Sequence, residues 1–287
     1  MSSTFSVVIP TGDRQRYLAL AVADLVAQDF PDERYEIIVV DDTEEGSNHD
    51  LVEGLAAAAS VPIRYERRVG LRGINAARNT GIRHGSGDVF AFVDDDDRLG
   101  PGWLAALDRG VESAPQAECF GGPIAISIEP PHPRWCGRED FPITVLDHGP
   151  ADRYVDVVFG ANFAVRRSAF ERVGLFDDER RLYGDEVEWL LRLRRAGGRV
   201  RYVVDAAVTH TRFANDVTLR QMLRGALLKG ANTAHFDLDQ GIVEPLRRVL
   251  RRAFRMSAHA VVYRCWSAAT HALQAYVYAY YTALSRR

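Results

Sequence analysis

Short apolar runs alternate with amphipathic segments over the first 113 residues. The continuous apolar runs predict β-strands at 5–9, 35–40 and 89–93, and the segment "IRYERR" (63–68) is expected to form a further strand. Segments with apolar residues every three or four positions predict helices at 15–28, 51–59, 73–84 and 101–112. Strands without internal polar alternation are typical of a sheet that is covered on both faces. We therefore expect an α/β fold with a mostly parallel central sheet and helices on both sides.

The pattern changes after residue 115. Apolar stretches at 117–128 and 153–165 flank the proline-rich, charged segment "EPPHPRWCGREDFP". A helix is expected at 185–196 and strands at 199–204 and 206–210, and everything from about 216 onward is predicted to be helical.

Composition excludes several classes of protein. The net charge of −3 provides no general basic field, so a nucleic-acid partner is not expected. Cys119, Cys136 and Cys265 lie far apart, which argues against a disulfide framework or a thiolate zinc site. The N-terminus lacks the layout of a secretory signal. These features favour a cytoplasmic protein.

Carboxylates follow two of the predicted strands directly. Asp41 and Asp42 end one strand, and a run of four aspartates, 94–97, ends another. Ligands of such sheets bind beyond the carboxyl ends of the strands. Six carboxylates at one edge repel one another unless a cation is present, and Mg²⁺ or Mn²⁺ suits oxygen ligands. The alternative is a solvated acidic turn.

Two finer expectations follow for this edge. In an extended segment residues i and i+2 point the same way, so Asp94 and Asp96 could share one metal. Arg78, on the helix that precedes the acidic strand, could neutralise a diphosphate beside that metal, although a helix arginine can also be ordinary solvated surface.

Six ordered segments carry a family resemblance: "FSVVIPTGDR", "EIIVVDD", "AARNTGI…GDVFAFVDDDD", "FGANFAVRRSAFERVGLFDD", "GDEVEWLLRLRRAGGRV" and "AAVTH". Together they resemble a family 2 glycosyltransferase of GT-A fold over roughly residues 5–212. The resemblance implies an inverting enzyme that uses Mg²⁺ or Mn²⁺ to move a sugar from a nucleotide diphosphate sugar to an acceptor, usually a hydroxyl. It also implies a catalytic domain at 1–215, with a nucleotide-binding half (1–100) and an acceptor-binding half (101–215), followed by a helical region at 216–287.

The resemblance also assigns roles to individual residues. The donor and its nucleotide would be bound by Pro10, Thr11, Asp41, Arg78, Asp94, Asp95 and Asn162. The metal would be bound by Asp96 as the main ligand, with Asp94 and His210. A histidine that ends a strand can equally be a satisfied core residue, so both interpretations of His210 stay open.

The general base would be one of two adjacent acids, Asp185 and Glu186. The family pair is usually Glu-Asp, so the reversed order here leaves the identity of the base open. Counting forward from Glu186 by three, four and seven positions gives Trp189, Leu190 and Leu193, an apolar stripe that should face inward. A buried carboxylate is a better base, which favours Glu186 over Asp185.

Other positions depart from the family pattern or extend it. Gly12 and Asp13 stand where an aromatic residue and an amide are usual, so contacts with the base could differ there. Trp135 and Trp189 are candidate acceptor contacts, and Trp135 could instead pin its loop to the core.

The C-terminal region allows several interpretations. The segment "LRRVLRRAFR" (246–255) is a basic amphipathic helix, and residues 265–285 contain no formal charge. That length could cross a bilayer, but its polar and aromatic content argues against a span. We expect helices that pack on the catalytic domain or form a homodimer. Docking on the inner face of a membrane is the alternative.

Two other functions share parts of this pattern. A sugar-phosphate nucleotidyltransferase would need a glycine-rich, basic phosphate loop, of which "PTGDRQR" is a poor version. A non-catalytic sugar- or nucleotide-binding module would not need an acid pair opposite the metal site. The pattern therefore favours the glycosyltransferase, with the donor sugar and the acceptor left open.

Overall fold

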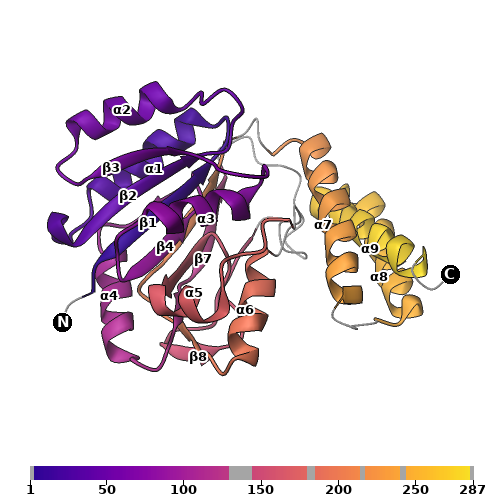
Figure 1. Cartoon of the computed structure of the whole chain (residues 1–287). Helices are drawn as coiled ribbons and strands as arrows, with labels where there is room; N and C mark the ends of the chain where they lie inside the picture. The colour runs from indigo at the N-terminus through magenta and orange to yellow at the C-terminus, as the bar shows by residue number, and fades with distance from the viewer. Residues whose placement is uncertain (1–2, 129–143, 180–184, 214–216, 240–243, 285–287) are drawn as a thin grey trace. The chain divides into compact units, whose positions relative to one another are not determined.

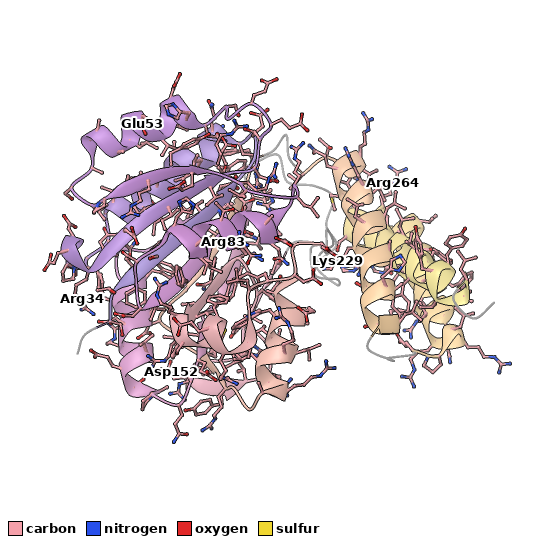
Figure 2. All side chains as sticks on the ribbon, viewed as in Figure 1. Arg34, Glu53, Arg83, Asp152, Lys229 and Arg264 are labelled. Atoms are coloured by element: carbon pink, nitrogen blue, oxygen red, sulfur yellow. The ribbon has the colours of Figure 1, made fainter. Side chains whose placement is uncertain are left out.

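A computed structural model describes residues 3–128, 144–179, 185–213, 217–239 and 244–284 (Figure 1). The chain divides into two compact units. The first comprises Met1–Ile126, Thr144–Arg181 and Asp185–Thr211, and the second consists mainly of Arg212–Arg287. The charged side chains of Glu53 and Arg83 lie on the outside of the first unit (Figure 2).

The first unit is built on an eight-stranded sheet with the order β3-β2-β1-β4-β9-β6-β10-β8. Its strands are β1 (Phe5–Thr11), β2 (Tyr35–Asp41), β3 (Ile63–Arg67), β4 (Val89–Val93), β6 (Cys119–Gly121), β8 (Arg153–Val155), β9 (Asn162–Arg166) and β10 (Val200–Tyr202). The strands β3, β2, β1 and β4 are parallel, and β9 runs antiparallel to both β4 and β6. The α/β fold is confirmed, with a parallel half and a mixed half.

A smaller sheet has the order β5-β11-β7. Its strands are β5 (Asp97–Leu99), β7 (Ile124–Ile128) and β11 (Val208–Arg212). The antiparallel pairing of β5 with β11 sets His210 opposite Asp97.

Helices cover both faces of the large sheet. Those of the first unit are α1 (Gln15–Val26), η1 (Asp32–Arg34), α2 (His49–Ala58), α3 (Ile74–His84), α4 (Trp103–Ser113), α5 (Arg167–Val173) and α6 (Asp185–Arg195). The helices α1 and α2 connect β1 to β2 and β2 to β3 in one direction along the sheet, whereas α3 connects β3 to β4 in the reverse direction. Because such crossovers are right-handed, α3 lies on the opposite face from α1 and α2 (Figure 1). The helices predicted before residue 115 are all found, with ends shifted by one or two residues.

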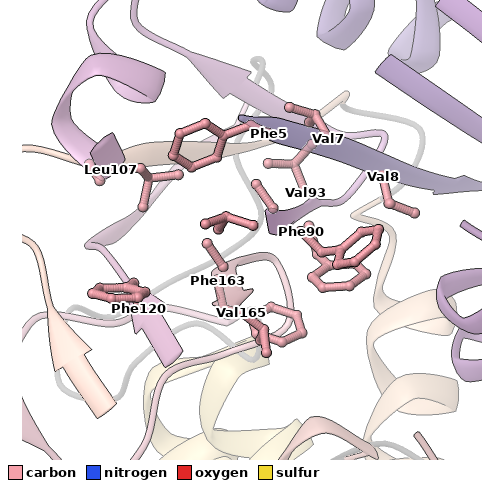
Figure 3. Close-up of a cluster of buried hydrophobic side chains, with 14 of the residues drawn as sticks. Phe5, Val7, Val8, Phe90, Val93, Leu107, Phe120, Phe163 and Val165 are labelled. Atoms are coloured by element: carbon pink, nitrogen blue, oxygen red, sulfur yellow. The ribbon is translucent and has the colours of Figure 1, made fainter. Parts of the chain in front are cut away.

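The core lies between the sheet and these helices (Figure 3). All five residues of β4 are buried, and Phe92 stacks on Phe163 of the neighbouring strand with ring centroids 4.7 Å apart. Gly81 allows α3 to lie directly on β1, because a Cβ at this position would overlap the side chain of Val8. The continuous apolar runs of the sequence are thus strands buried on both faces.

The described part of the second unit contains three helices: α7 (Leu219–Asp239), α8 (Leu246–Tyr263) and α9 (Trp266–Leu284). The helix α9 packs against both α7 and α8. Small or slender side chains such as Ala268 and Ala272 are buried, and the hydroxyl of Tyr278 donates to Asp237 at 2.8 Å. The uncharged stretch of the sequence is therefore the central helix of this unit. Among the described residues, no helix combines the length and the apolar character needed to cross a bilayer.

A buried carboxylate ties β1 and β2 to the loop that precedes β4. Oε1 of Glu36 accepts hydrogen bonds from the Ser6 hydroxyl (2.8 Å) and from both the N–H and the hydroxyl of Ser86 (2.6 and 2.7 Å). Nη2 of Arg64 lies 3.3 Å from Oε2. Burial alone would raise the pKa of Glu36, but the hydrogen bonds from Ser86 and Ser6 and the charge of Arg64 outweigh it, so this pKa is lowered.

Replacing Glu36 should separate the contribution of its hydrogen bonds from that of its charge. Glu36→Ala leaves the buried Ser6 hydroxyl, and the N–H and hydroxyl of Ser86, without their acceptor and should lower the free energy of unfolding by about 1–3 kcal/mol at pH 7. Glu36→Gln keeps an acceptor and should cost less. A lowered pKa in the folded state stabilises above the unfolded pKa of about 4.3 and loses that effect as pH falls through the folded value. The difference between wild type and Glu36→Gln in urea unfolding should therefore shrink in acid. A constant difference down to pH 3 would contradict this account.

Candidate active site

The candidate site lies where the direction of strand addition reverses. From β1 the chain adds β2 and then β3 on one side, and it returns to place β4 on the other side of β1. Such a switch point leaves a crevice at the carboxyl ends of the two central strands. Thr11 ends β1 there, and Asp94 follows β4.

The four aspartates form a turn, which corrects the expectation of an extended segment. The N–H of Asp97 donates to the carbonyl of Asp94 at 3.2 Å, and Oδ2 of Asp97 accepts the N–H of Asp94 at 2.8 Å. Asp97 itself begins β5. The alternation of an extended strand therefore does not apply to Asp94 and Asp96.

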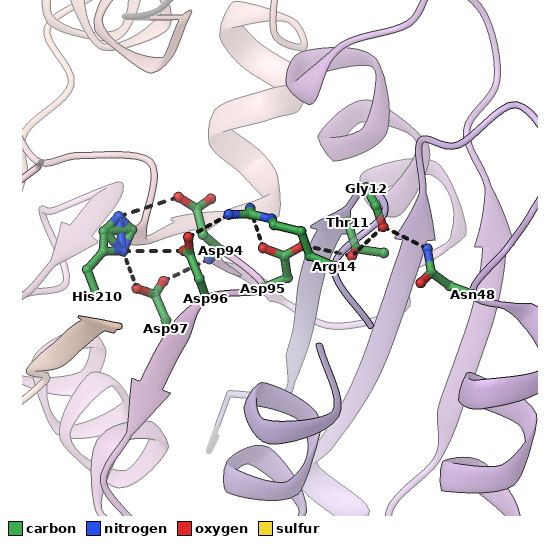
Figure 4. A network of polar contacts seen from close by, with 9 residues as sticks. All are labelled: Thr11, Gly12, Arg14, Asn48, Asp94, Asp95, Asp96, Asp97 and His210. Atoms are coloured by element: carbon green, nitrogen blue, oxygen red, sulfur yellow. Dashed lines mark hydrogen bonds and ion pairs between the residues drawn. The ribbon is translucent and has the colours of Figure 1, made fainter. Parts of the chain in front are cut away.

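His210 faces this turn from β11 (Figure 4). Its Nδ1 lies 2.7 Å from Oδ1 of Asp97 and 3.5 Å from Oδ1 of Asp96, and its Nε2 lies 3.8 Å from Oδ2 of Asp94. Burial would lower the pKa of His210, but its hydrogen bond to Asp97 and the charge of that carboxylate raise it. Burial in turn raises the pKa of Asp97. His210 is thus fixed on a buried carboxylate, with its other nitrogen turned toward Asp94.

Three ligand atoms converge at this point. One atom each from Asp94, Asp97 and His210 lies within 4.8 Å of the others. Asp97 and His210 are buried, and the side chain of Asp94 is 25% exposed, so one side of the cluster is open to a ligand. The sequence predicted Asp94, Asp96 and His210 as metal ligands but not Asp97. The reason is that an extended segment would point residues i and i+2, here Asp94 and Asp96, to the same side.

Arg14 supplies positive charge that sequence reasoning also missed. Its guanidinium pairs with Asp95 and, at 2.6 Å, with Oδ2 of Asp96. The hydroxyl of Thr11 donates to Asp95 at 2.8 Å, which ties the end of β1 to the acidic turn. Burial nevertheless raises the pKa of Asp95. The signal that could have revealed Arg14 was its position three residues after the end of a strand that borders the site.

Asp41 holds a loop of its own chain, which argues against the contact with a base that we expected. Oδ1 accepts the N–H and the hydroxyl of Thr43 at 2.8 and 2.6 Å. Oδ2 accepts the N–H of Asn48 at 3.0 Å and the hydroxyl of Tyr65 at 3.1 Å. Burial raises the pKa of Asp41, but these hydrogen bonds outweigh it and lower the pKa. With two hydrogen bonds to each oxygen, the carboxylate has no lone pair left for a nucleotide base.

The side chain of Asn162, which we expected to bind the donor, is wholly buried. Its amide oxygen accepts the indole N–H of Trp103 at 3.1 Å, and its amide nitrogen donates to the carbonyls of Pro123 (3.1 Å) and Ala206 (2.7 Å). Asn162 therefore joins four segments of the fold and presents no polar group to a donor sugar. Pro10 is also buried, within β1.

Arg78 and Glu186 lie together in a second group. Nη1 of Arg78 is 3.9 Å from Oε2 of Glu186, and their side chains are 3% and 14% exposed. The guanidinium rests on the rings of Phe163 and Phe176, 5.5 and 5.9 Å from their centroids. Its Nε and Nη1 have no hydrogen-bond partner in the described part of the chain. Gly160 provides the space, because a Cβ there would overlap Arg78.

The helix that carries Glu186 turns its predicted stripe inward. Trp189, Leu190 and Leu193 are all buried, as expected. The acceptor role considered for Trp189 is wrong for this structure, because its ring is wholly buried and its indole N–H donates to the carbonyl of Gly174 at 2.8 Å. The side chain of Asp185, and all of Trp135, lie outside the described residues.

Comparisons with known proteins agree with this geometry. The glycosyl transferase family 2 model matches residues 6–174. The chain is 27% identical over 220 residues to the glucosyl-dolichyl phosphate glucuronosyltransferase of Haloferax volcanii, covering 72% of this chain and 69% of that protein. It is 28% identical over 203 residues to the succinoglycan biosynthesis protein ExoM of Rhizobium meliloti, covering 68% and 63%.

The fold has solved relatives. A mannosyltransferase from Pyrobaculum calidifontis superposes with a TM-score of 0.66 at 15% identity, covering all of this chain (100%) and 89% of that one. A GalNAc-T7 structure gives a TM-score of 0.57 at 19% identity, covering 80% and 48%. These likenesses identify the fold as GT-A. With the family model matching more than half of its length, the chain belongs to glycosyl transferase family 2.

Proposed function

We propose that this glycosyltransferase inverts the anomeric centre of a nucleotide diphosphate sugar as it transfers the sugar to an acceptor hydroxyl, with the help of Mg²⁺ or Mn²⁺. The observation that carries the proposal is the convergence of Asp94, Asp97 and His210 at the switch point of the sheet. Two fold relatives support it: the Pyrobaculum mannosyltransferase is in complex with GDP-Man and Mn²⁺, and the GalNAc-T7 structure contains UDP, GalNAc and Mn²⁺.

The residues of the cluster fit such a cation. Carboxylates suit Mg²⁺ and Mn²⁺, and imidazole also binds transition metals. Metal-binding histidines usually have their second ring nitrogen hydrogen-bonded to a carboxylate, as His210 has to Asp97. We therefore assign Asp94 and Nε2 of His210 as ligands, with Asp97 holding the ring. Asp96, the main ligand implied by the resemblance, lies beside them with one oxygen paired to Arg14. When bound, the metal supplies positive charge for the leaving diphosphate.

The donor would lie along the ends of β1 and β4. Pro10 and Thr11 would border the nucleotide base, and Asp94 would contact the ribose or diphosphate. Asp95 would contribute through Thr11 and Arg14, to which its buried carboxylate is bound. Nε and Nη1 of Arg78 have no hydrogen-bond partner among the described residues, so we propose that Arg78 binds an oxygen of the donor. Asp41 and Asn162 support this crevice through their own hydrogen bonds and are left out of the donor-binding set.

Glu186 is the proposed general base. It would take the proton of the acceptor hydroxyl while that oxygen attacks the anomeric carbon from the side opposite the diphosphate. Arg78 lies 3.9 Å from the carboxylate of Glu186 as an ion pair and would orient it. The rings of Phe163 and Phe176 pack against the guanidinium and restrict the movement of Arg78. Because Trp189, Leu190 and Leu193 anchor the helix, Glu186 stands on a rigid support.

Removing one proposed ligand should weaken the metal site without unfolding the chain. Asp94→Asn should lower the affinity for Mn²⁺ about tenfold or more, because a neutral amide replaces a charged ligand. The Asp97→Asn variant should lower it by about 10–100-fold through the lost support of His210. Calorimetry with Mn²⁺ alone, and with UDP or GDP in the presence of Mn²⁺, measures both effects.

Asp205→Asn is the matched control, because that side chain is 71% exposed and pairs only weakly with Arg109 at 3.5 Å. Unchanged Mn²⁺ affinity in Asp94→Asn and Asp97→Asn would refute the metal site. Loss of Mn²⁺ binding in Asp96→Asn alone would return the main ligand to Asp96.

The two acids at the start of α6 should differ in their effect on catalysis. Glu186→Gln should lower kcat by roughly 10²–10⁴ and leave binding of UDP or GDP nearly unchanged. Asp185→Asn should be milder. Release of nucleoside diphosphate from UDP-glucose and GDP-mannose, with water as the acceptor, provides the assay.

Glu188→Gln is the control on the same helix, because Glu188 is about as little exposed as Glu186 (17% and 14%) but pairs with Arg192 at 2.8 Å, so its replacement should have little effect on kcat. A larger loss of kcat in Asp185→Asn than in Glu186→Gln would transfer the role of base to Asp185.

A further inference from the structure

The helix α8 exposes an apolar stripe that no other described element covers. Leu250, Phe254 and Val261 are 41%, 70% and 78% exposed. At 100° per residue these three side chains lie within about 40° of one another around the helix. The buried residues Val249 and Ala253 lie about 100° and 60° from Leu250, in the direction away from Phe254, and face the core of the second unit. An exposed phenylalanine aligned with two aliphatic residues is a surface that gains free energy when it leaves water.

Arginines line one edge of this stripe. Arg247, Arg251 and Arg255 follow at about 60°, 100° and 140° from Leu250, and all three are exposed. Arg248 and Arg252 continue the basic face, and Arg252 pairs with Glu244, which lies two residues before the helix. The helix contains no aspartate or glutamate. Its outward half is therefore divided lengthwise into an apolar part and a strongly basic part.

The charge of the whole C-terminal segment has the same sign. Residues 217–287 contain eleven lysines and arginines and three aspartates and glutamates, a net charge of +8. The entire chain carries −3, so the preceding 216 residues carry −11. The basic charge is thus concentrated in the part of the chain that also carries the exposed apolar stripe.

We propose that this face of α8 docks on the surface of an anionic lipid bilayer. The apolar stripe would enter the boundary between headgroups and acyl chains, and the arginines would bind lipid phosphates while their stems lie along the apolar boundary. The helix would lie in the plane of the interface, in agreement with the absence of a spanning helix among the described residues. This inference goes beyond the proposed transfer reaction and does not depend on it.

The composition of the face favours lipid over the other two occupants. Pairing with a second copy through this face would bring two sets of five arginines together, with no acidic residue on either helix and with Glu244 already paired to Arg252. A nucleic acid would meet the arginines but would leave Phe254 and Val261 in water. A bilayer with anionic headgroups is the surface that satisfies both halves of the face at once.

Sedimentation of the full chain with lipid vesicles tests the proposal. The chain should pellet with vesicles of phosphatidylcholine containing about a third phosphatidylglycerol, and much less with pure phosphatidylcholine. Phe254→Ser should weaken partitioning about tenfold or more, because it removes a large apolar side chain from the interface. The double variant R247Q/R251Q should weaken it about 25-fold, at roughly fivefold per arginine. These side chains are exposed, so the fold should be retained, which far-UV circular dichroism checks.

Matched controls lie in the first unit. Val69→Ser removes an apolar side chain that is 60% exposed. The variant R83Q/R109Q removes the same charge from exposed positions on α3 and α4, the first of which is labelled in Figure 2. Both controls should bind vesicles like wild type, which would show that the effect belongs to the α8 face.

Three outcomes would overturn the proposal. The first is the absence of binding to vesicles that contain phosphatidylglycerol. The second is an equal loss of binding in the controls. The third is a dimer in analytical ultracentrifugation that Phe254→Ser converts to a monomer, without vesicle binding, which would assign the face to a second copy. None of these measurements involves sugar transfer, so failure here is distinguishable from failure of the proposed function.

Discussion

The hydrogen bond between His210 and Asp97 is the contact on which the candidate site depends. It joins residues 113 positions apart, and the pairing of β5 with β11 places the two opposite each other. Because Asp97 is fully buried, its carboxylate fixes the imidazole and anchors the turn through the N–H of Asp94. The pairing of His210 with Asp97 therefore sets the position of Asp94, whose partly exposed side chain leaves one side of the cluster open to solvent.

The acidic turn is stabilised by basic side chains of the chain itself. Arg14 pairs with Asp95 and Asp96, and His210 lies against Asp97. The second acidic strand end is separate, since β1 lies between β2 and β4 and two strand spacings amount to about 10 Å. There Asp42 pairs with Arg68, while Asp41 is saturated by hydrogen bonds. The six carboxylates that the sequence places at one edge therefore do not form a single metal site. Most are paired with basic or hydrogen-bonding groups of the chain, and Asp94 remains partly exposed beside Asp97 and His210.

The two units use apolar residues differently. In the first, Phe92 stacks on Phe163, and the ring of Phe163 lies against the guanidinium of Arg78. In the second, the uncharged helix α9 lies between two others, so its lack of charge reflects burial within a three-helix unit. The basic charge and the exposed apolar stripe are left to α8. The residues of the proposed active site therefore lie in the first unit, and the exposed apolar and basic face lies in the second.

Local sequence determined the elements and the edge of the sheet at which the site would lie. Continuous apolar runs, glycines and helical spacing predicted β1–β4 and α1–α4 closely, because these signals act over a few residues. The inward stripe of Trp189, Leu190 and Leu193 was predictable for the same reason. Tertiary structure alone decided which polar atoms remain for a ligand. The hydrogen bonds that use up Asn162, the rings beneath Arg78 and the pairing of Asp97 with His210 join segments far apart in the chain. Whether a buried polar group binds its own chain or a ligand depends on such distant partners, which no local pattern contains.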